Sequence, residues 1–220
     1  MDEITTEPLA PEQRDTATAL LADAFFRDPV LSWLLPAEDR RKEALERFFA
    51  LETEHVLRYA DSLVATRRGT ARGVLLVLPP GHWRTSFLSQ ARHGATYASI
   101  FGIRLGRANA LQSRLNRLHP REPHYFIPMI GVATTAQGTG VGSALLEQLT
   151  ARCDAEGLPA YLEATSPESA RLYRRHGFVT KRTVEGIGRK RRRKWPTIEL
   201  MARKPGAAGE SSSEPGAAEG

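Results

Sequence analysis

The chain has 220 residues, 41% of them hydrophobic and 25% charged, and its 31 lysines and arginines against 25 aspartates and glutamates give a formal net charge of +6. A chain of this length buries roughly 70% of its unfolded surface, and its single cysteine and six scattered histidines exclude a disulfide framework and argue against a zinc site. The polar, acidic start lacks the pattern of a signal peptide and no run approaches about 18 apolar residues, so we expect a cytoplasmic protein that uses no metal.

Helical periodicity dominates the first part of the chain. The apolar residues of 20–25 fall on one helical face, and the Asp28–Pro29 pair ends that helix and starts a short one that runs to Leu35. Residues 38–59 keep a second apolar face, with arginine and glutamate on the opposite side, and predict a third helix.

The period then changes to that of strands. Ser62–Thr66 and Arg72–Leu78 are β-branched and aliphatic runs separated by turn residues, which predicts a hairpin. Residues 81–119 are rich in arginine and lack a clean period, but several of their leucines share a helical stripe, so we expect this region to be mostly helical.

A strand, a helix and a strand follow from His124. The strand covers His124–Ala133, the helix covers Gly140–Glu156 with Cys153 on its buried face, and the second strand covers Ala160–Thr165. Two strands joined through a helix run parallel. Cys153 is therefore expected to be a structural residue rather than a nucleophile.

A short helix over Pro167–Arg175, with Gly177 at its C-terminal end, leads into two closing strands, Phe178–Val184 and Thr197–Ala202. The predicted fold class is mixed α/β. We expect one domain over residues 1–203.

Two segments near the C-terminus have unusual composition. Residues 189–194 are six consecutive cations, equal to the whole net charge, so the rest of the chain sums to zero. Three interpretations of this basic run are open: a solvated loop, a clamp for an acidic substrate or phosphate, or a nucleic-acid contact. We favour the solvated loop. A nucleic-acid partner is not expected, because Trp195 is the only aromatic residue beside the run. Residues 204–220 hold almost only Gly, Ala, Ser, Glu and Pro and predict a disordered tail.

The glycine-rich segment Gln137–Ser143 lies between a strand and a helix. Its glycines let backbone N–H groups approach an anion, and the start of the helix adds partial positive charge, so a diphosphate fits here. A Walker loop would need Lys after Gly142, and a dinucleotide fingerprint would need Gly or Ala in place of Ser143. The alternative is that these glycines only pack the helix against the strand.

Gln137, Gly140 and Gly142 are followed, about 35 residues later, by a Tyr-x-x-x-Gly-Phe sequence over 173–178. This order resembles the Gcn5-related N-acetyltransferase family, and residues 121–178 look most like the puromycin N-acetyltransferase group. The sequence differs from many members of the family at Ser166, where they have Asn, and at Ser169, where they have Ala.

The resemblance implies a mostly antiparallel sheet with a splayed parallel pair flanked by helices, and acetyl-CoA as co-substrate with no metal. It implies acetylation of a primary amine on a small molecule, such as an antibiotic of the puromycin type, by direct transfer in a ternary complex. A bulge near Ile130 would leave one N–H to polarise the thioester carbonyl. The implied cofactor-binding residues are Ile130, Gly131, Val132, Gln137, Gly138, Thr139, Gly140, Val141, Gly142 and Ser143.

Tyr173 is the candidate acid that protonates the departing thiolate, because a phenol with a pKa near 10 keeps its proton at neutral pH. The alternative is an aromatic residue that packs the short helix onto the sheet. Glu163 is the candidate base, acting directly, through water or by binding the substrate ammonium; the alternative is an internal ion pair with an arginine. Glu52, Glu54 and His55 are weaker candidates, expected on the surface of their helix.

Two other functions stay open on the sequence. The acceptor could be a protein or peptide amine that docks through the basic run, or the chain could be a CoA-binding or nucleic-acid-binding module without turnover. The sequence leaves a monomer and a homodimer equally open.

Overall fold

The computed structural model describes residues 3–83, 87–185 and 196–207, and no side chain is described within 87–92. The basic run at 189–194 and residues 208–220 of the expected tail lie outside the described residues. Of that tail, residues 204–207 form a turn in which the Gly206 N–H donates to Asp154 Oδ1 at 2.6 Å.

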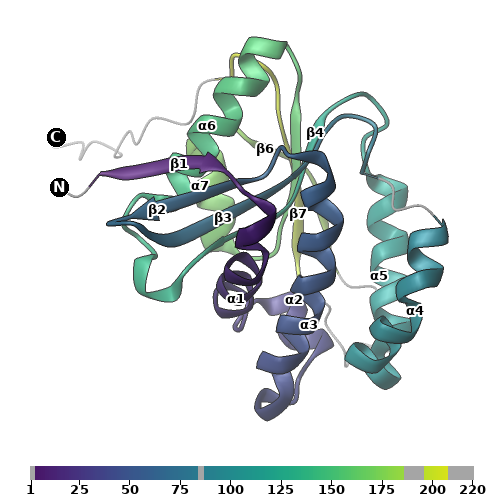
Figure 1. The fold of residues 1–220 in the computed structure, drawn as a ribbon. Helices are drawn as coiled ribbons and strands as arrows, with labels where there is room; N and C mark the ends of the chain where they lie inside the picture. The colour runs from purple at the N-terminus through teal and green to yellow at the C-terminus, as the bar shows by residue number, and fades with distance from the viewer. Residues whose placement is uncertain (1–2, 84–86, 186–195, 208–220) are drawn as a thin grey trace, which may run out of the picture.

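Seven strands form one sheet in the order β1-β2-β3-β4-β5-β7-β6 (Figure 1). The β4–β5 pair is parallel and every other pair is antiparallel, as the sequence predicted. The strands are β1 Ile4–Pro8, β2 Leu63–Arg67, β3 Thr70–Leu78, β4 Tyr125–Val132, β5 Ala160–Ala164, β6 Val179–Val184 and β7 Ile198–Arg203.

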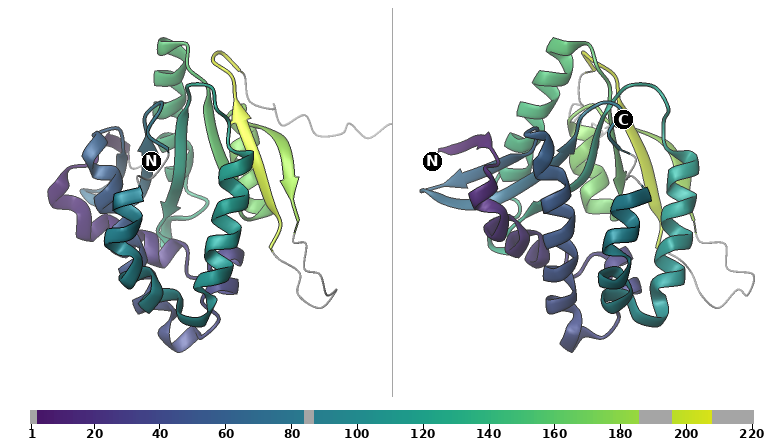
Figure 2. Two further views of the ribbon diagram at one scale, coloured as in Figure 1. Left: turned by 90° about the vertical axis from the view of Figure 1, so that its right-hand side faces the viewer. Right: turned by 45° about the vertical axis from the view of Figure 1, so that its right-hand side comes forward.

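Helices cover both faces of the sheet (Figure 2). Helices α1 to α5 pack on one face and build a core around Leu21, Leu45 and Phe49, whereas α6 and α7 pack on the other around Leu145 and Leu149. The helices are α1 Arg14–Ala24, α2 Pro29–Leu34, α3 Glu38–Val56, α4 Phe87–Phe101, α5 Leu105–Leu118, α6 Val141–Glu156 and α7 Pro167–Arg175. None of the described helices is long and apolar enough to cross a membrane.

Almost every expected element is present within a few residues of its predicted bounds. Residues 81–119 contain the α4–α5 hairpin, which stands beside α3 (Figures 1 and 2). Gly177 has a φ of 82°, and the Phe178 N–H donates to Tyr173 O at 3.1 Å, which ends α7 as predicted. The sequence analysis did not predict β1, a short and mostly polar strand that pairs only with β2 at the edge of the sheet.

The parallel pair separates after three residues. Pairing between β4 and β5 stops at Ile127 and Leu162, and the next β4 residue, Pro128, has no N–H to donate. Val77 of β3 stands opposite both Ile127 and Pro128, because the register shifts by one residue there. We call the region where residues 128–132 and 163–164 no longer pair the β4–β5 parting.

The bulge expected near Ile130 therefore lies two or three residues earlier, at Ile127–Pro128. Ile130 itself pairs regularly with Leu75 of β3. The resemblance thus implied a bulge in this part of β4, and the structure gives its register.

Two glycines allow helices to approach the sheet closely. A Cβ at Gly131 of β4 would lie 2.8 Å from Leu21 Cδ2 of α1, and a Cβ at Gly73 of β3 would lie 2.6 Å from Val141 Cγ1 of α6. Both contacts are shorter than side chains tolerate, so only glycine lets α1 lie this close to β4 and the first turn of α6 lie this close to β3.

We predict that Gly73→Ala lowers the free energy of unfolding by about 1–3 kcal/mol, because the added methyl group overpacks the contact with Val141. Urea unfolding measures this change. The matched control is Gly106→Ala on α5, where a Cβ meets no atom within 4 Å and where alanine should stabilise the helix by about 0.5–1 kcal/mol. Equal stabilities of the two variants would contradict the close packing of α6.

Candidate active site

The glycine turn between β4 and α6 presents unused backbone donors. Gly138 and Gly140 have φ values of 76° and 92°, a conformation that other residues rarely adopt. The first helical bond of α6 runs from Ala144 N to Gly140 O at 3.0 Å, so the N–H groups of residues 141–143 have no acceptor within the helix. These groups and the start of the helix make an anion site.

The turn is tied to the end of β4 and to α7. Gln137 donates through Nε2 to Val132 O at 3.3 Å, and the Thr139 hydroxyl donates to Ala136 O at 2.7 Å. A Cβ at Gly142 would lie 3.1 Å from Leu172 Cδ2, so α7 lies directly against the first turn of α6. Three parts of the expected site therefore adjoin one another: the cofactor residues of the turn, the last residues of β4 and the helix that carries Tyr173.

Tyr173 is almost fully buried on the face of the sheet that α6 and α7 cover. Burial raises the pKa of its phenol, and the nearby carboxylate of Asp28 raises it further. A hydrogen bond with Ser169 lowers the pKa, but by less than these two effects raise it. The phenol therefore keeps its proton at neutral pH, as a proton donor must. Its ring also packs 6.1 Å from the ring of Phe178, so both expected interpretations of Tyr173 fit its position.

Ser166 and Ser169 cap the start of α7 together. The Ser166 hydroxyl accepts from Ser169 N at 3.1 Å, and Ser169 Oγ accepts from Ser166 N at 3.3 Å. This reciprocal cap is worth about 1 kcal/mol to a helix. Ser169, where many members of the family have Ala, thus adds the second hydrogen bond of this cap.

Asp28 is a site residue that the sequence analysis interpreted only as a helix start. Its Oδ1 accepts from Val30 N and Leu31 N at 2.9 and 2.8 Å, which caps α2, and its Oδ2 accepts from the Thr165 hydroxyl at 2.5 Å. Burial raises the pKa of Asp28 by more than these hydrogen bonds lower it. Asp28 thus joins α2 to the end of β5, close enough to Tyr173 to affect its pKa, and no local sequence signal reveals a partner 137 residues away.

Glu163 lies on β5 at the start of the parting. Burial raises the pKa of its carboxyl to about 7, against a hydrogen bond that the Tyr161 hydroxyl donates to its Oε1 at 3.3 Å. No ion pair with an arginine is found for it among the described residues, which argues against the structural alternative. A carboxyl with a pKa near neutrality is suited to exchange protons at physiological pH.

Glu163 and Tyr173 lie on opposite faces of the sheet. Tyr161 belongs to the core on the side of α1 to α5, whereas Leu162 and Tyr173 belong to the core on the side of α6 and α7. Side chains alternate along a strand, so Glu163 shares the face of Tyr161. No hydrogen bond joins the two candidates, and a reacting group between them would meet one from each side.

The weaker candidates on α3 differ from one another. Glu54 is exposed, as expected, and approaches Arg14 at 3.8 Å. Glu52 is not a free surface residue: its Oε1 accepts from the Tyr97 hydroxyl at 2.7 Å, and burial raises its pKa. His55 is half-buried, and burial lowers its pKa. The expectation of surface positions was therefore wrong for Glu52, because α4 covers that side of α3.

Other chemistry finds little support among the described residues. Cys153 is fully buried, and burial raises the pKa of its thiol to about 11, so it is not a nucleophile at neutral pH. No group of three histidine, cysteine or acidic side chains there is arranged to hold a metal ion.

Comparison with known proteins gives concordant matches. The acetyltransferase (GNAT) family model matches residues 14–178. An uncharacterised N-acetyltransferase of Schizosaccharomyces pombe is 28% identical over 216 residues, which cover 92% of this chain and 85% of that protein.

Two solved structures share the fold. One, from Corynebacterium glutamicum, is described as histone acetyltransferase HPA2 and related acetyltransferase; it has a TM-score of 0.68 and 29% identity, with 93% of this chain and 97% of that chain covered. The other is arylalkylamine N-acetyltransferase 2 of Aedes aegypti, with a TM-score of 0.64, 16% identity, and 92% and 99% covered.

We predict that Glu163→Gln stabilises the protein at about pH 8 by up to about 3 kcal/mol, and much less at about pH 4.5. The folded-state pKa lies above the reference value of 4.5, so the stability linked to this group is fully present below that value and is lost as the pH rises through about 7. Urea unfolding at both pH values tests this. Glu54→Gln, at an exposed carboxyl, is the control, and a pH-independent effect of Glu163→Gln would contradict the raised pKa.

Proposed function

The chain belongs to the acetyltransferase (GNAT) family, and from that premise we propose that it transfers the acetyl group of acetyl-CoA directly to a primary amine of a small molecule within a ternary complex. The protein is an N-acetyltransferase, and its family implies acetyl-CoA as co-substrate. The observation that supports direct transfer best is the β4–β5 parting, which adjoins the glycine turn and lies between Glu163 and Tyr173.

The residues of the turn fit the coenzyme. In our proposal the unused N–H groups over Gly138–Ser143 bind its pyrophosphate, with Gln137 at the edge of the turn. The backbone of Ile130–Val132 pairs with the pantetheine arm, because that stretch pairs with β3 on one side and has lost β5 on the other. This places the thioester in the parting, between the two candidate catalytic side chains.

Four changes make up the proposed reaction. Glu163 takes a proton from the substrate ammonium, directly or through water, which frees the nitrogen lone pair to attack the thioester carbonyl. A backbone N–H of β4 beside the parting stabilises the tetrahedral oxyanion. The carbon–sulfur bond then breaks, and Tyr173 protonates the departing thiolate. The nitrogen gives up its remaining extra proton, which restores the Tyr173 phenol directly or through water, and Glu163 releases its proton to solvent. Each group suits its step: the pKa of Glu163 is raised to about 7, and that of Tyr173 is raised above its ordinary value.

The proposed acceptor is a small amine-bearing molecule such as an antibiotic of the puromycin type. The resemblance of residues 121–178 to puromycin N-acetyltransferases supports this, and the fold shared with an arylalkylamine N-acetyltransferase is consistent with a small amine. A peptide amine is the second candidate, favoured by the likeness to the Corynebacterium glutamicum protein described as related to a histone acetyltransferase.

We predict that Gly140→Trp weakens CoA binding at least about tenfold, which corresponds to about 1.4 kcal/mol, because the indole would cover the N–H groups of the turn. Isothermal titration calorimetry with CoA measures the dissociation constant. Gly157→Trp is the matched control, since Gly157 ends the same helix in the same left-handed conformation with open space around it. Equal affinities in the two variants would place the pyrophosphate elsewhere.

We predict that Tyr173→Phe lowers kcat by about 10²-fold or more, because the thiolate then departs without a proton donor. Release of free CoA thiol from acetyl-CoA is followed with a panel of puromycin, arylalkylamines, a diamine and a lysine-containing peptide. Tyr125→Phe, which removes a buried hydroxyl from the face of α6, is the control. An unchanged rate for Tyr173→Phe across the pH range contradicts its role, and turnover of the peptide alone favours the second candidate.

A further inference from the structure

Tyr161 donates the one hydrogen bond that the described residues give to the Glu163 carboxylate, at 3.3 Å. Both residues lie on β5, two positions apart, so their side chains point to the same face of the sheet. Tyr161 is 2% exposed, and burial raises the pKa of its phenol, so its hydroxyl remains a donor throughout the working pH range.

Aromatic rings hold the Tyr161 ring on several sides. His119 packs at 4.6 Å with an interplanar angle of 68°, His124 at 5.8 Å and 74°, and Phe126 of the adjacent strand at 5.9 Å and 35°. Trp83 stacks on His119, with ring centroids 3.9 Å apart. The phenol therefore cannot swing away from Glu163 without displacing these rings.

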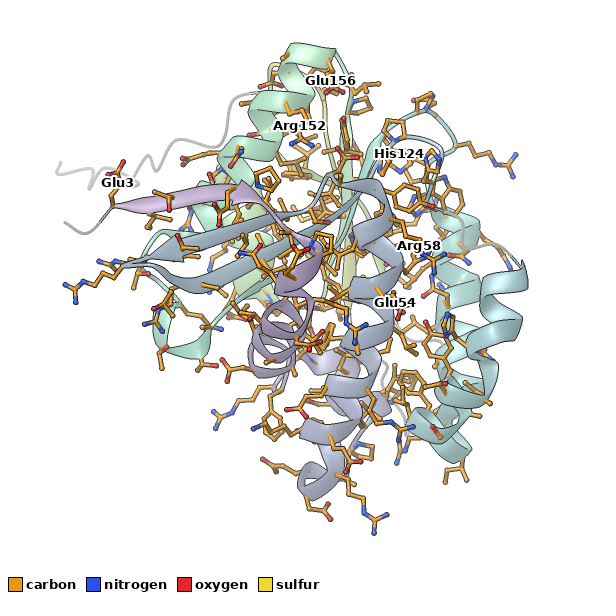
Figure 3. All side chains as sticks on the ribbon, viewed as in Figure 1. Glu3, Glu54, Arg58, His124, Arg152 and Glu156 are labelled. Atoms are coloured by element: carbon orange, nitrogen blue, oxygen red, sulfur yellow. The ribbon has the colours of Figure 1, made fainter. Side chains whose placement is uncertain are left out.

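The two histidines form a hydrogen-bonded pair with a defined direction. His124 Nδ1 lies 2.6 Å from Glu122 O, and a carbonyl only accepts, so this nitrogen carries a proton. Burial lowers the pKa of His124, which leaves its Nε2 with a lone pair at neutral pH. His119 Nε2, at 2.9 Å, must then donate to it. Both rings are fixed in orientation, near the point where the chain from α5 enters β4, as the position of His124 in Figure 3 shows.

We propose that Tyr161 is a positioning residue for the reaction: clamped by the His119–His124 pair, its hydroxyl orients the Glu163 carboxylate and favours its ionised form. The inference rests on the proposed function of Glu163 as a base. A hydrogen bond to the ionised form of an acid lowers its pKa, so Tyr161 opposes the effect of burial and keeps part of Glu163 ionised at neutral pH.

Acidic groups on the elements around β5 have partners of their own. Asp28, on the α2 side, is bonded to Thr165 and to the N–H groups of its own helix. Glu199 of β7 forms an ion pair with Arg174 at 2.5 Å. Glu52, on α3, is bonded to Tyr97 of α4. Burial and the Tyr161 hydroxyl are the two influences that set the pKa of Glu163.

The first test is the pH dependence of kcat/KM with one amine in three proteins. Tyr161→Phe is expected to move the acidic limb to higher pH by about one unit, the order of effect of a hydrogen bond to a charged group, and to approach the wild-type rate well above it. Tyr125→Phe removes a hydroxyl that also donates to a carboxylate, Glu156, at 2.7 Å but on the other face, and should leave the limb unmoved. A rate for Tyr161→Phe that is lower at every pH, with no movement of the limb, overturns the proposal.

A second measurement does not depend on turnover. In protein labelled with ¹³C at glutamate carboxyls, Glu163→Gln identifies the resonance of Glu163, and its titration midpoint is expected near pH 7 in the wild type. The midpoint should rise in Tyr161→Phe and stay unchanged in Tyr125→Phe. Equal midpoints in the wild type and Tyr161→Phe overturn the inference. A wild type that acetylates no amine contradicts the proposed function instead, and this titration still decides the role of Tyr161.

Discussion

Pro128 follows directly after the last β4 residue that pairs with β5, and the site depends on that interruption. The extra residue opposite Val77 bends β4 at this point, and the pairing with β5 ends there. The strand then continues with regular pairs to β3 alone, through Val132. The first residues of the β4–β5 pair thus hold the sheet together. The residues that follow do not pair with one another and leave backbone groups free beside the glycine turn.

The surrounding packing keeps this region open and ordered. Gly131 lets α1 lie close to β4, Gly142 lets α7 lie close to the first turn of α6, and Gly73 lets α6 lie close to β3, so these helices are held tightly against the sheet and one another. Asp28 links α2 to the end of β5 from the other side. The arrangement places a backbone anion site, a phenol and a carboxyl around one location, each held by a different element.

Burial is the main cause of the raised pKa at Asp28, Glu163 and Tyr173. Moving ionisable groups out of water lowers the stability of a folded protein unless they are neutral or paired. Groups with strongly raised pKa values beside an opened sheet are typical of sites where proton transfer matters more than stability. Burial also raises the pKa of the Cys153 thiol, but this residue lies within the packed face of α6, as a structural residue does.

Much of the fold could be predicted from the sequence, because helical and strand periods are local. The parallel pair followed from a strand, a helix and a strand in order, and the glycine turn from its residue types between a strand and a helix. Tyr173 was indicated by the resemblance of residues 173–178 to the Gcn5-related family. The Asp28–Thr165 contact, the covering of Glu52 by α4 and the position of the bulge are tertiary properties that no local pattern contains. The Tyr161–Glu163 bond is an intermediate case: residues two apart on a strand share a face, so their spacing was a usable signal.

A crystal structure of the complex with CoA tests the proposed site most directly, through the distance between the coenzyme sulfur and the Tyr173 hydroxyl. We expect a hydrogen-bond distance of about 3.5 Å or less, with the pantetheine arm alongside Ile130–Val132 and the pyrophosphate on the turn over Gly138–Ser143. A CoA molecule bound outside the β4–β5 parting, or a sulfur beyond the reach of Tyr173, would contradict the proposed site.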